Sequence, residues 1–400
     1  MRTITDLLYG RGAAKFESNE SFQPIFQSWS MIGITTLKSN RTRDVLHMCF
    51  CWFCILLSPF SFYMGYVQTL RTKPITDQLS LLQAIFNVTG LPLKAIFIKI
   101  SQSHLRTTEA IFVRLDERCQ SAESREQIKK CVVLSARIFT VVGSVYHLYG
   151  STTILQAFFT DNYPLQTWLP FTDYIPQPTI KYYSHFMFEV FHIYFLLTVQ
   201  FTNDVFPAIY IRNLRTHMNL LTERVSRLGS NPEFTDDQNF NELVDCIATH
   251  QDLLVVKDIV ESVCSVTVFI EFVAVATAHC ICMLNFFVFA DRFQQMVILS
   301  YYLGVIMQIM PVCYQASMIM EDSAKLPDAI FHCNWLAMDK RSRKLIIYFI
   351  HRAQENMTFV ALKLFKIDMT TNLSIVKFAF TLYTFMNNMG FGQNMKELLE

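Results

Sequence analysis

The side chains best able to do chemistry lie inside apolar stretches of this sequence. His185, Glu189 and His192 are four and three residues apart, so in a helix they share one face. Imidazole and carboxylate groups bind zinc, but three ligands on one straight helix converge poorly on a single ion. A hydrogen-bonded pair that orients a pocket, or that braces this helix against His147, is the favoured interpretation. Glu271 has no evident partner in the sequence, and both structural pairing and a role in gating fit it.

The eleven cysteines do not form the framework of a disulfide-bonded protein. Cys49, Cys51 and Cys54 are clustered, yet one helix cannot direct three thiolates at one metal ion. Polar stretches that the charge pattern assigns to the reducing cytosol hold four more, namely Cys119, Cys131, Cys246 and Cys333. We therefore expect free thiols and no metal site. Because the sequence also has no Gly-rich phosphate loop, His-Glu-x-x-His pair or nucleophile elbow, we expect neither an enzyme nor a bound cofactor.

Seven apolar stretches must position these side chains. Each has roughly the ~20 residues that a helix needs to cross ~30 Å of hydrocarbon. The chain is 52% hydrophobic and only 17% charged, a combination that is rare in soluble domains, and it has no basic run suited to nucleic acid. We expect an all-α membrane protein with seven transmembrane helices, centred on residues 45–67, 79–100, 132–160, 182–211, 256–290, 296–320 and 371–389.

The Lys and Arg residues between these stretches predict the orientation in the membrane. Residues 1–44, 101–131, 212–257 and 321–344 carry 6, 6, 5 and 5 of them, whereas the alternate segments carry 2, 1, 1 and 1. Basic loops stay in the cytoplasm. The N-terminus is therefore predicted to be cytoplasmic and the C-terminus extracellular, which is the reverse of a G-protein-coupled receptor.

Several helical patterns outrun the bilayer on the predicted cytoplasmic side. Residues 253–290 form one unbroken helix-compatible run, and the fourth and sixth spans continue through 214–228 and 319–331. A further amphipathic helix is predicted at 345–365, where apolar residues recur every three or four positions. It could lie on the membrane surface, but together these extensions favour a cytosolic anchor bundle. The Pro-rich loop 161–178 cannot be a helix, and it is either a folded lid over spans three and four or a plain surface loop.

The C-terminal third resembles the insect odorant receptor family, from Pro311 to Met389. Three motifs carry the resemblance: SAKLPDAIFHCNW, with Ser323, Leu326, Ala329, Phe331 and Trp335; RSRKLIIYFIHRAQ, which ends at Gln354; and LSIVKFAFTLYTFMNNM, with Ser374, Lys377, Phe380 and Thr381. The resemblance implies an odour-tuning subunit of a tetrameric, ligand-gated, non-selective cation channel in the plasma membrane of a sensory neuron dendrite. It also implies a shared coreceptor subunit as partner, a ligand pocket among spans two to six, and a pore lined by the last span.

The resemblance divides the single 1–400 domain into four parts: a cytoplasmic segment 1–44, spans one to six with the pocket at 45–320, anchor helices at 321–370, and a pore span at 371–389. A pocket for small apolar volatiles needs aromatic walls and few polar groups. We expect it to draw on the outer halves of the spans, although packing or lipid contact competes for each residue: Phe86, Tyr146, His147, Tyr149, Gly150, Tyr183, Met187, Phe188, Phe191, Met283, Phe287, Tyr301 and Tyr302.

On the last span, Thr381, Phe385, Asn388 and Met389 share a face. The resemblance favours a pore there, with an apolar constriction that gates by dewetting, over simple helix packing. The nearest alternative family is the gustatory receptors, whose last span ends in a Thr-Tyr, five-residue gap, Gln-Phe pattern. Here Leu382 follows Thr381, which argues against that family. A secondary transporter should show inverted repeats and broken helices, and neither is visible.

Overall fold

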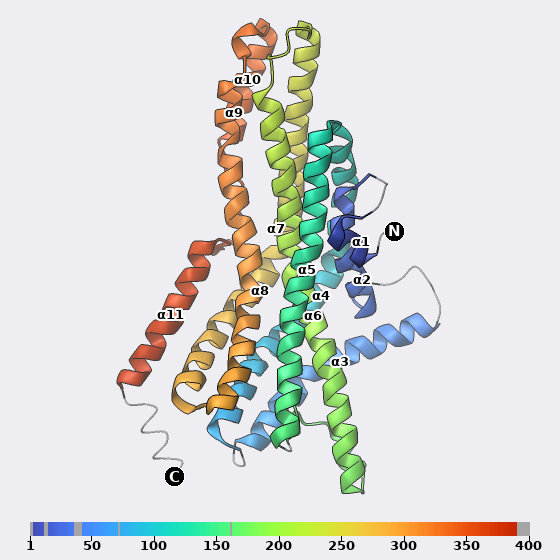
Figure 1. The fold of residues 1–400 in the computed structure, drawn as a ribbon, viewed down its shortest axis with the longest axis vertical. Helices are drawn as coiled ribbons and strands as arrows, with labels where there is room; N and C mark the ends of the chain where they lie inside the picture. Colours follow the sequence, from blue (N-terminus) through green and yellow to red (C-terminus); the bar gives the residue numbers. More distant parts are fainter. Residues whose placement is uncertain (1–2, 12–14, 36–41, 71–72, 161, 390–400) are drawn as a thin grey trace.

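The protein is an elongated bundle of long helices, described here by a computed structural model for residues 3–11, 15–35, 42–70, 73–160 and 162–389 (Figure 1). Seven long helices contain the seven predicted apolar stretches and extend beyond them. Two exceptions are the C-terminal end of the 256–290 stretch and Met389, which lie just outside these helices. The long helices are α3 (Thr42–Thr69), α4 (Ile75–Arg118), α5 (Ala122–Thr160), α6 (Pro178–Ser226), α7 (Asp236–Leu284), α8 (Arg292–Ala324) and α11 (Met369–Asn388). The shorter elements are α1 (Ile4–Tyr9), η1 (Ser18–Phe22), α2 (Gln23–Met31), η2 (Pro170–Tyr174), the π-helical turn η3 (Asn285–Phe289), α9 (Leu326–His332), η4 (Trp335–Ala337) and α10 (Lys340–Ala353).

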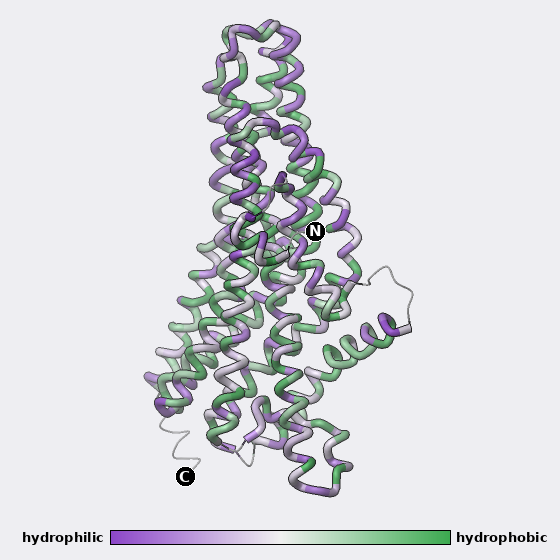
Figure 2. The backbone as a smooth tube through the Cα atoms, turned by 45° about the vertical axis from the view of Figure 1, so that its right-hand side comes forward, coloured by the Kyte–Doolittle hydropathy of each residue, from purple (hydrophilic) through white to green (hydrophobic). Residues whose placement is uncertain are grey.

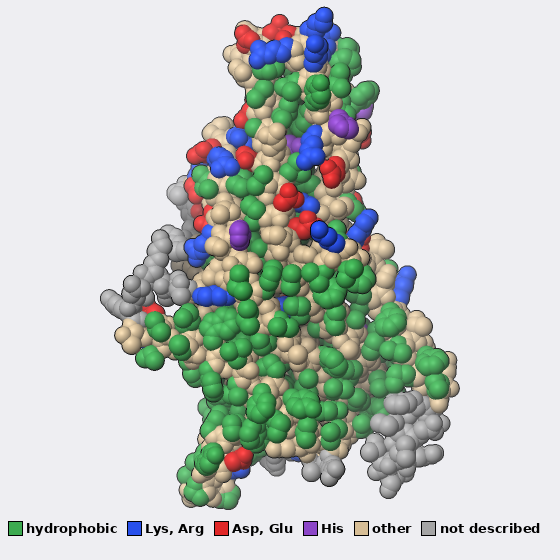
Figure 3. Space-filling model, turned by 180° about the vertical axis from the view of Figure 1, so that it is seen from behind, with side chains coloured by type: hydrophobic (Ala, Val, Ile, Leu, Met, Phe, Trp, Pro, Cys, Tyr) green, Lys and Arg blue, Asp and Glu red, His purple; other side chains and the backbone are tan. Residues whose placement is uncertain are grey.

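The surface divides into an apolar half and a charged half. Lys, Arg, Asp and Glu side chains gather over the upper half of the face seen in Figure 3, and hydrophobic side chains dominate the lower half, with few charges among them. The backbone coloured by hydropathy shows the same division, with hydrophilic residues more frequent toward the upper end (Figure 2). Five of the described helices are long and apolar enough to cross a membrane, namely α3, α4, α5, α7 and α8. Since an apolar surface of this extent is unfavourable in water, the protein is a membrane protein.

Helix α6 is not among these five, and it lies at the centre of the bundle, where it contacts α4, α5, α7 and α8. Every residue from 199 to 211 is buried, so no face of this segment meets lipid. It can therefore carry polar side chains, provided that neighbouring elements pair with them. Asn203 accepts a hydrogen bond from Trp29 Nε1 of α2 at 3.0 Å, and His192 lies 3.4 Å from the carbonyl oxygen of Cys54 in α3.

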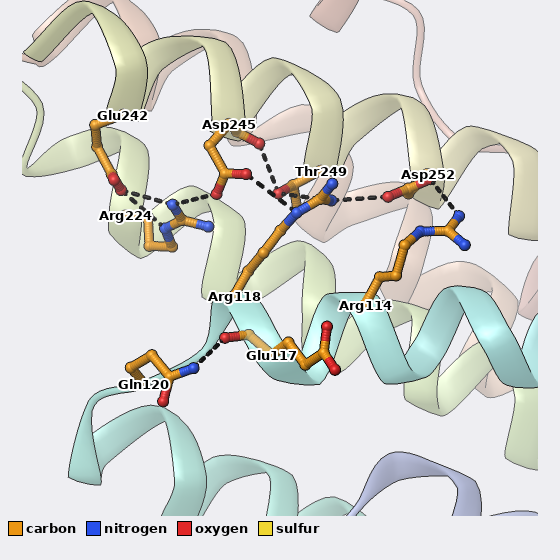
Figure 4. Close-up of polar contacts among 9 residues, drawn as sticks. All are labelled: Arg114, Glu117, Arg118, Gln120, Arg224, Glu242, Asp245, Thr249 and Asp252. Carbon is orange, nitrogen blue, oxygen red and sulfur yellow. Dashed lines mark hydrogen bonds and ion pairs between the residues drawn. The ribbon is translucent and has the colours of Figure 1, made fainter. Parts of the chain in front are cut away.

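Beyond the apolar half, the helices continue as a charged stalk. Arginines of α4 and α6 face a row of acids on the first turns of α7 (Figure 4). Arg118 pairs with Asp245 at 3.1 Å and with Asp252 at 2.7 Å, while Arg224 pairs with Asp245 at 2.8 Å. Because these side chains are partly exposed, each pair contributes at most about 1 kcal/mol, and the network acts by aligning the three helices. We call this end of the molecule the charged end and the opposite end the far end.

One predicted helix, at 345–365, is wrong in its second half. Helix α10 ends at Ala353, and a short antiparallel hairpin follows, formed by β1 (Val360–Ala361) and β2 (Phe365–Lys366). Here Met357, Phe359 and Ala361 are buried and the residues between them are not, which is the two-residue period of an extended chain. Apolar residues in this segment also recur at spacings of three and four, and that pattern led to the incorrect prediction of a helix.

The segment before the first span is pinned to the stalk by a buried polar cluster. Ser18 of η1 donates from its hydroxyl to Asp116 Oδ1 at 2.7 Å and from its backbone N–H to Asp116 Oδ2 at 2.8 Å. Its hydroxyl also lies 2.9 Å from His217 Nε2, and His217 is 3.4 Å from Asp116. Burial alone would lower the pKa of His217, but the hydrogen bond and charge of Asp116 outweigh it and raise that pKa to about 9. Burial alone would raise the pKa of Asp116, but its hydrogen bonds with His217 and Ser18 and the charge of His217 outweigh burial and lower that pKa.

This cluster predicts a pH-dependent stability. Because the pKa of His217 is raised in the folded state, its contribution is complete below its unfolded value of about 6.5 and is lost as pH rises through about 9. The contribution is on the order of 3 kcal/mol at most. The melting temperature of the protein in nanodiscs should therefore fall as the pH rises from about 6.5 to about 9, and D116N should flatten that fall. An equal slope in D116N would contradict the role of this cluster.

Candidate functional site

A cavity lies within the apolar half, between five helices and one loop. About 740 Å³ of space not occupied by protein atoms lies in and around it, part of which is open to solvent. Most of its lining is aliphatic or aromatic. The lining residues are Phe62 of α3; Ala84, Asn87, Val88 and Leu91 of α4; Tyr146, Tyr149 and Thr153 of α5; Leu165 of the loop; Ile193, Leu196, Leu197 and Gln200 of α6; and Tyr301, Gly304, Val305 and Gln308 of α8.

A chain of hydrogen bonds gives one wall of the cavity its polar character. Gln308 donates to the Asn87 amide oxygen at 3.1 Å, and Asn87 donates to the Tyr301 hydroxyl at 2.5 Å. That hydroxyl donates in turn to the backbone carbonyl of Gln83 at 3.4 Å. The ring of Tyr301 meets that of Tyr149 edge-on, with centroids 5.0 Å apart. The chain holds both tyrosines in place, so the cavity is preformed and its few polar groups have fixed directions.

A second, more polar cavity adjoins the first toward the far end. The two share Phe62, Ala84, Tyr149, Thr153, Leu165 and Tyr301. The outer cavity is lined further by polar side chains from the start of α4, the end of α5 and the loop, among them Asp77, Gln156 and Asn162. Together the two cavities form a route from the far end to the apolar interior, and Tyr149, Leu165 and Tyr301 stand at the junction.

The loop before α6 is held over the cavity by Glu189. This carboxylate is fully buried and accepts hydrogen bonds from the backbone N–H groups of Leu165 and Thr167, both at 2.8 Å, and from the Thr167 hydroxyl at 2.6 Å. His185 Nε2 lies 3.3 Å away. Since the Leu165 side chain lines the cavity, Glu189 sets part of the roof. The sequence left open whether 161–178 is a folded lid or a plain surface loop, and the hydrogen bonds of Leu165 and Thr167 favour the lid. Asp161 itself lies outside the described residues.

The opposite side of the same loop lies directly on α3. The Trp168 N–H donates to the carbonyl oxygen of Ser61 at 3.0 Å. At Gly65 a Cβ atom would stand 2.3 Å from the Gln166 carbonyl oxygen, so only glycine permits this approach. Gln166 has a φ of +52°, a left-handed conformation that an L residue adopts at a cost. The loop is thus clamped between α3 and α6.

A buried ion pair lies beneath the cavity floor. Lys94 of α4 meets Asp204 of α6 at 2.5 Å, and Tyr146, which lines the cavity, donates its hydroxyl to Asp204 at 2.9 Å. All three side chains are buried. Glu271 of α7 is buried near this pair, and its Oε1 has no hydrogen-bond partner in the part of the chain that the structure describes. Removal of one partner from such a pair strands a charge, which costs about 3–5 kcal/mol.

The structure brings three of the predicted pocket residues to the cavity, namely Tyr146, Tyr149 and Tyr301. Gly150 lies just behind the wall, where it lets α5 pack closely against Ile193 and Leu197. His147 braces α5 against α6 through Thr198, 3.3 Å away, rather than through Glu189. The other predicted residues are not among the lining, and several are well exposed on the apolar surface: Phe86, Tyr183, Met187, Phe188, Phe191, Met283, Phe287 and Tyr302.

The sequence analysis missed Phe62, Leu165 and the amides of the cavity. Asn87, Gln200 and Gln308 are uncharged polar residues inside apolar stretches, and that signal could have identified them. Phe62 and Leu165 are apolar residues without a distinguishing pattern. The predicted pocket was also limited to spans two to six, which excluded span one and the loop. His185, Glu189 and His192 do not converge on one point, because Glu189 bonds the loop while His192 turns to α3. No group of three or more His, Cys, Asp or Glu in the described chain could hold a metal ion.

Helix α11 stands apart on the flank of the bundle, where it packs on α7 and α8 (Figure 1). Ala379 is its single buried residue among those described. Thr381, Phe385, Asn388 and Met389 are all exposed. A twenty-residue helix with so little burial leaves a large part of its surface free to contact something other than this chain.

Comparisons with known proteins agree on one family. The family described as 7tm Odorant receptor matches residues 75–380. Odorant receptor 43b of Drosophila melanogaster is 31% identical over 344 residues, 85% of each chain, and Odorant receptor 42a of the same fly is 29% identical over 84% of this chain and 83% of the relative. The structure of the olfactory receptor OR5 from Machilis hrabei has the same fold, with a TM-score of 0.77 and 14% identity, over 95% of this chain and 99% of that one. A second structure of OR5, in complex with eugenol, matches with a TM-score of 0.76 and 15% identity, over 93% of this chain and 99% of that one.

The clamped loop yields a prediction for hydrogen exchange. In G65A the new Cβ would displace the Gln166 carbonyl, and E189Q would replace a carboxylate acceptor of three hydrogen bonds by a neutral amide. Each hydrogen bond to a charged group is worth about 1.5–3 kcal/mol, so the amides of residues 165–168 should exchange roughly tenfold faster or more in both variants. G304A is the matched control, because nothing lies within 4 Å of the added Cβ. Unchanged exchange in G65A and E189Q would mean that the loop is held elsewhere.

Proposed function

Since the chain belongs to the odorant receptor family, we propose that it is the odour-tuning subunit of a ligand-gated, non-selective cation channel. In this proposal it assembles with a shared coreceptor, as a tetramer, in the plasma membrane of a sensory neuron dendrite. The N-terminus faces the cytoplasm and the C-terminus the exterior, as the basic loops predict. The charged stalk then lies in the cytosol and the far end outside.

The ligand is a small, mostly apolar volatile, bound in this cavity. The observation that carries this proposal is the cavity's lining, which has aliphatic and aromatic walls and one amide-lined side. Most of the binding energy would come from burial of apolar surface, at ~25 cal/mol per Å². A single hydrogen-bonding atom on the ligand could address the chain of Asn87, Tyr301 and Gln308. A solved structure with the same fold, that of OR5 from Machilis hrabei, is in complex with eugenol, and this supports a small-ligand site in this chain.

The adjoining outer cavity is the entry route. A volatile that arrives from outside meets polar walls first and the apolar cavity second, and the side chains at the junction control its passage. The clamp on Leu165 keeps that passage narrow. Selectivity would then depend on both the cavity's shape and the position of the loop.

The pore is lined by α11 of each subunit. The exposure of Thr381, Phe385, Asn388 and Met389, and the near absence of buried residues on this helix, support a partner surface around a central axis. Phe385 and Met389 would form the apolar constriction, and Asn388 a neutral polar ring. Helices α9 and α10, the hairpin and the ends of α6, α7 and α8 would form the cytosolic anchor that holds the subunits together.

Ligand binding in the cavity should be separable from the rest of the channel. In cells that co-express the coreceptor, Y149A removes an aromatic wall, and we expect the whole-cell response to the best agonist of a volatile panel to shift by roughly tenfold or more in concentration. Currents evoked by a coreceptor agonist should be unchanged. F287A is the control, because Phe287 is 60% exposed and does not line the cavity. If F287A alters tuning and Y149A does not, the ligand binds elsewhere; if the wild type reaches the surface and no volatile evokes current, the channel proposal fails.

The pore assignment predicts which positions meet water. T381C and N388C should react with a membrane-impermeant thiol reagent when the channel is open, and the reaction should reduce the current. N387C is the matched control, because Asn387 is also exposed but lies about 100° or more around α11 from Thr381 and Asn388, and it should not respond. The wild type sets the background of native cysteines. Loss of current in N387C alone, or inertness of both T381C and N388C in every state, would place the pore on another face.

A further inference from the structure

A pocket with an excess of positive charge lies between α5 and α6, well away from the ligand cavity. It holds about 520 Å³ of space not occupied by protein atoms. Lys130 of α5 and Arg212 and Arg215 of α6 contribute the charges. The remaining lining residues are neutral and polar, namely Gln127, Thr216 and Asn219. No described residue of this pocket lines the cavity of the proposed function.

The nearby acids do not neutralise these cations. Asp322 of α8 pairs with Arg215 at 2.6 Å, but it also accepts from Asn219 at 3.2 Å and from Lys325 at 2.8 Å. Glu223 accepts two hydrogen bonds from the Gln127 amide, at 2.9 and 3.1 Å.

Arg212 has one donor left over: its Nε is buried and has no hydrogen-bond partner in the described chain. A buried, unsatisfied donor on a charged group is costly, and it indicates that a ligand completes the site.

The depth of the pocket in the molecule matches the surface of a bilayer. Lys130 comes two residues before the apolar stretch 132–160 of α5, and Arg212 comes one residue after the apolar stretch 182–211 of α6. Both cations therefore lie at the same edge of the apolar half, on the side of the charged stalk. Phosphate groups occupy this level in a membrane, and basic residues there attract them.

We propose that this pocket binds a phosphate-bearing anion. Two guanidinium groups and an ammonium group can each donate to different phosphate oxygens, and the planar fork of arginine matches that geometry. The volume would admit a ring that bears more than one phosphate. By joining α5 and α6 at the base of the apolar half, such an anion would stabilise the two helices that frame the ligand cavity. The proposal does not depend on which ligand that cavity takes.

The test uses the full chain in phosphatidylcholine nanodiscs and measures binding of two probes. One is a dioctanoyl phosphatidylinositol bisphosphate and the other is the soluble inositol trisphosphate. Tighter binding of the lipid identifies a membrane headgroup as the source, and equal or tighter binding of the trisphosphate identifies a soluble phosphate; either result supports the site. If neither probe binds above a phosphatidylcholine control, the proposal is overturned.

Substitutions locate the site. R212Q and K130Q should each raise the dissociation constant roughly tenfold or more, since each removes a charged hydrogen bond. R227Q is the matched control: it removes one positive charge from the exposed end of the same helix, where Arg227 pairs with Glu123. K130Q provides an independent test if R212Q fails to fold, because Lys130 is exposed and its substitution should not affect folding. Wild-type binding in both R212Q and K130Q, or equal loss in R227Q, would overturn the assignment.

Discussion

The structure depends on one constraint: the polar side chains of α6 are buried at the centre of the bundle, and each needs a partner. Burial of an unpaired polar group in an apolar layer costs several kcal/mol. The partners come from several elements. Glu189 pairs with the loop, and Asp204 with α4 and α5. Toward the charged end, Arg215 pairs with α8, His217 with η1 and α4, and Arg224 with α7. The order of these polar residues along one helix thereby helps to fix where the neighbouring elements pack.

The ligand cavity exists because α6 is fixed above and below it. Glu189 sets the roof through Leu165, and Asp204 sets the floor through Tyr146 and Lys94. Between these two points, α6 offers only Ile193, Leu196, Leu197 and Gln200 to the space. Side chains held from both ends cannot collapse into the gap, so the cavity stays open without a ligand. The cavity therefore differs from a pocket built of flexible loops. Its frame is rigid, and its walls make mainly apolar contacts, which depend little on the direction of approach.

The residues that line the cavity and the residues that face lipid are of the same types, mainly aliphatic and aromatic. Phe191 and Phe287 are as aromatic as Tyr149, yet both are exposed on the apolar surface. Inside a bilayer, hydrophobicity does not separate the interior of the protein from its exterior, because lipid is as apolar as a side chain. Amides carry more information than aromatics in this setting: Asn87, Gln200 and Gln308 all line the cavity. The error at 354–366 has a similar origin, since a short apolar pattern can fit both the helical and the extended period.

By itself, the sequence determined the class, the seven spans, their extension into a charged stalk and the family. These features follow from the length of apolar runs, from charge placement and from local motifs, and all three can be read along the chain. Only the tertiary structure decided which aromatic residues face the cavity, that Glu189 holds a loop rather than a metal, and that Lys94 pairs with Asp204. The Lys94–Asp204 pair joins residues that are 110 positions apart, and the Gln308–Asn87 hydrogen bond at the cavity wall joins residues 221 positions apart. Such contacts depend on the rotation of each helix about its own axis, which the helical period leaves open until the helices pack.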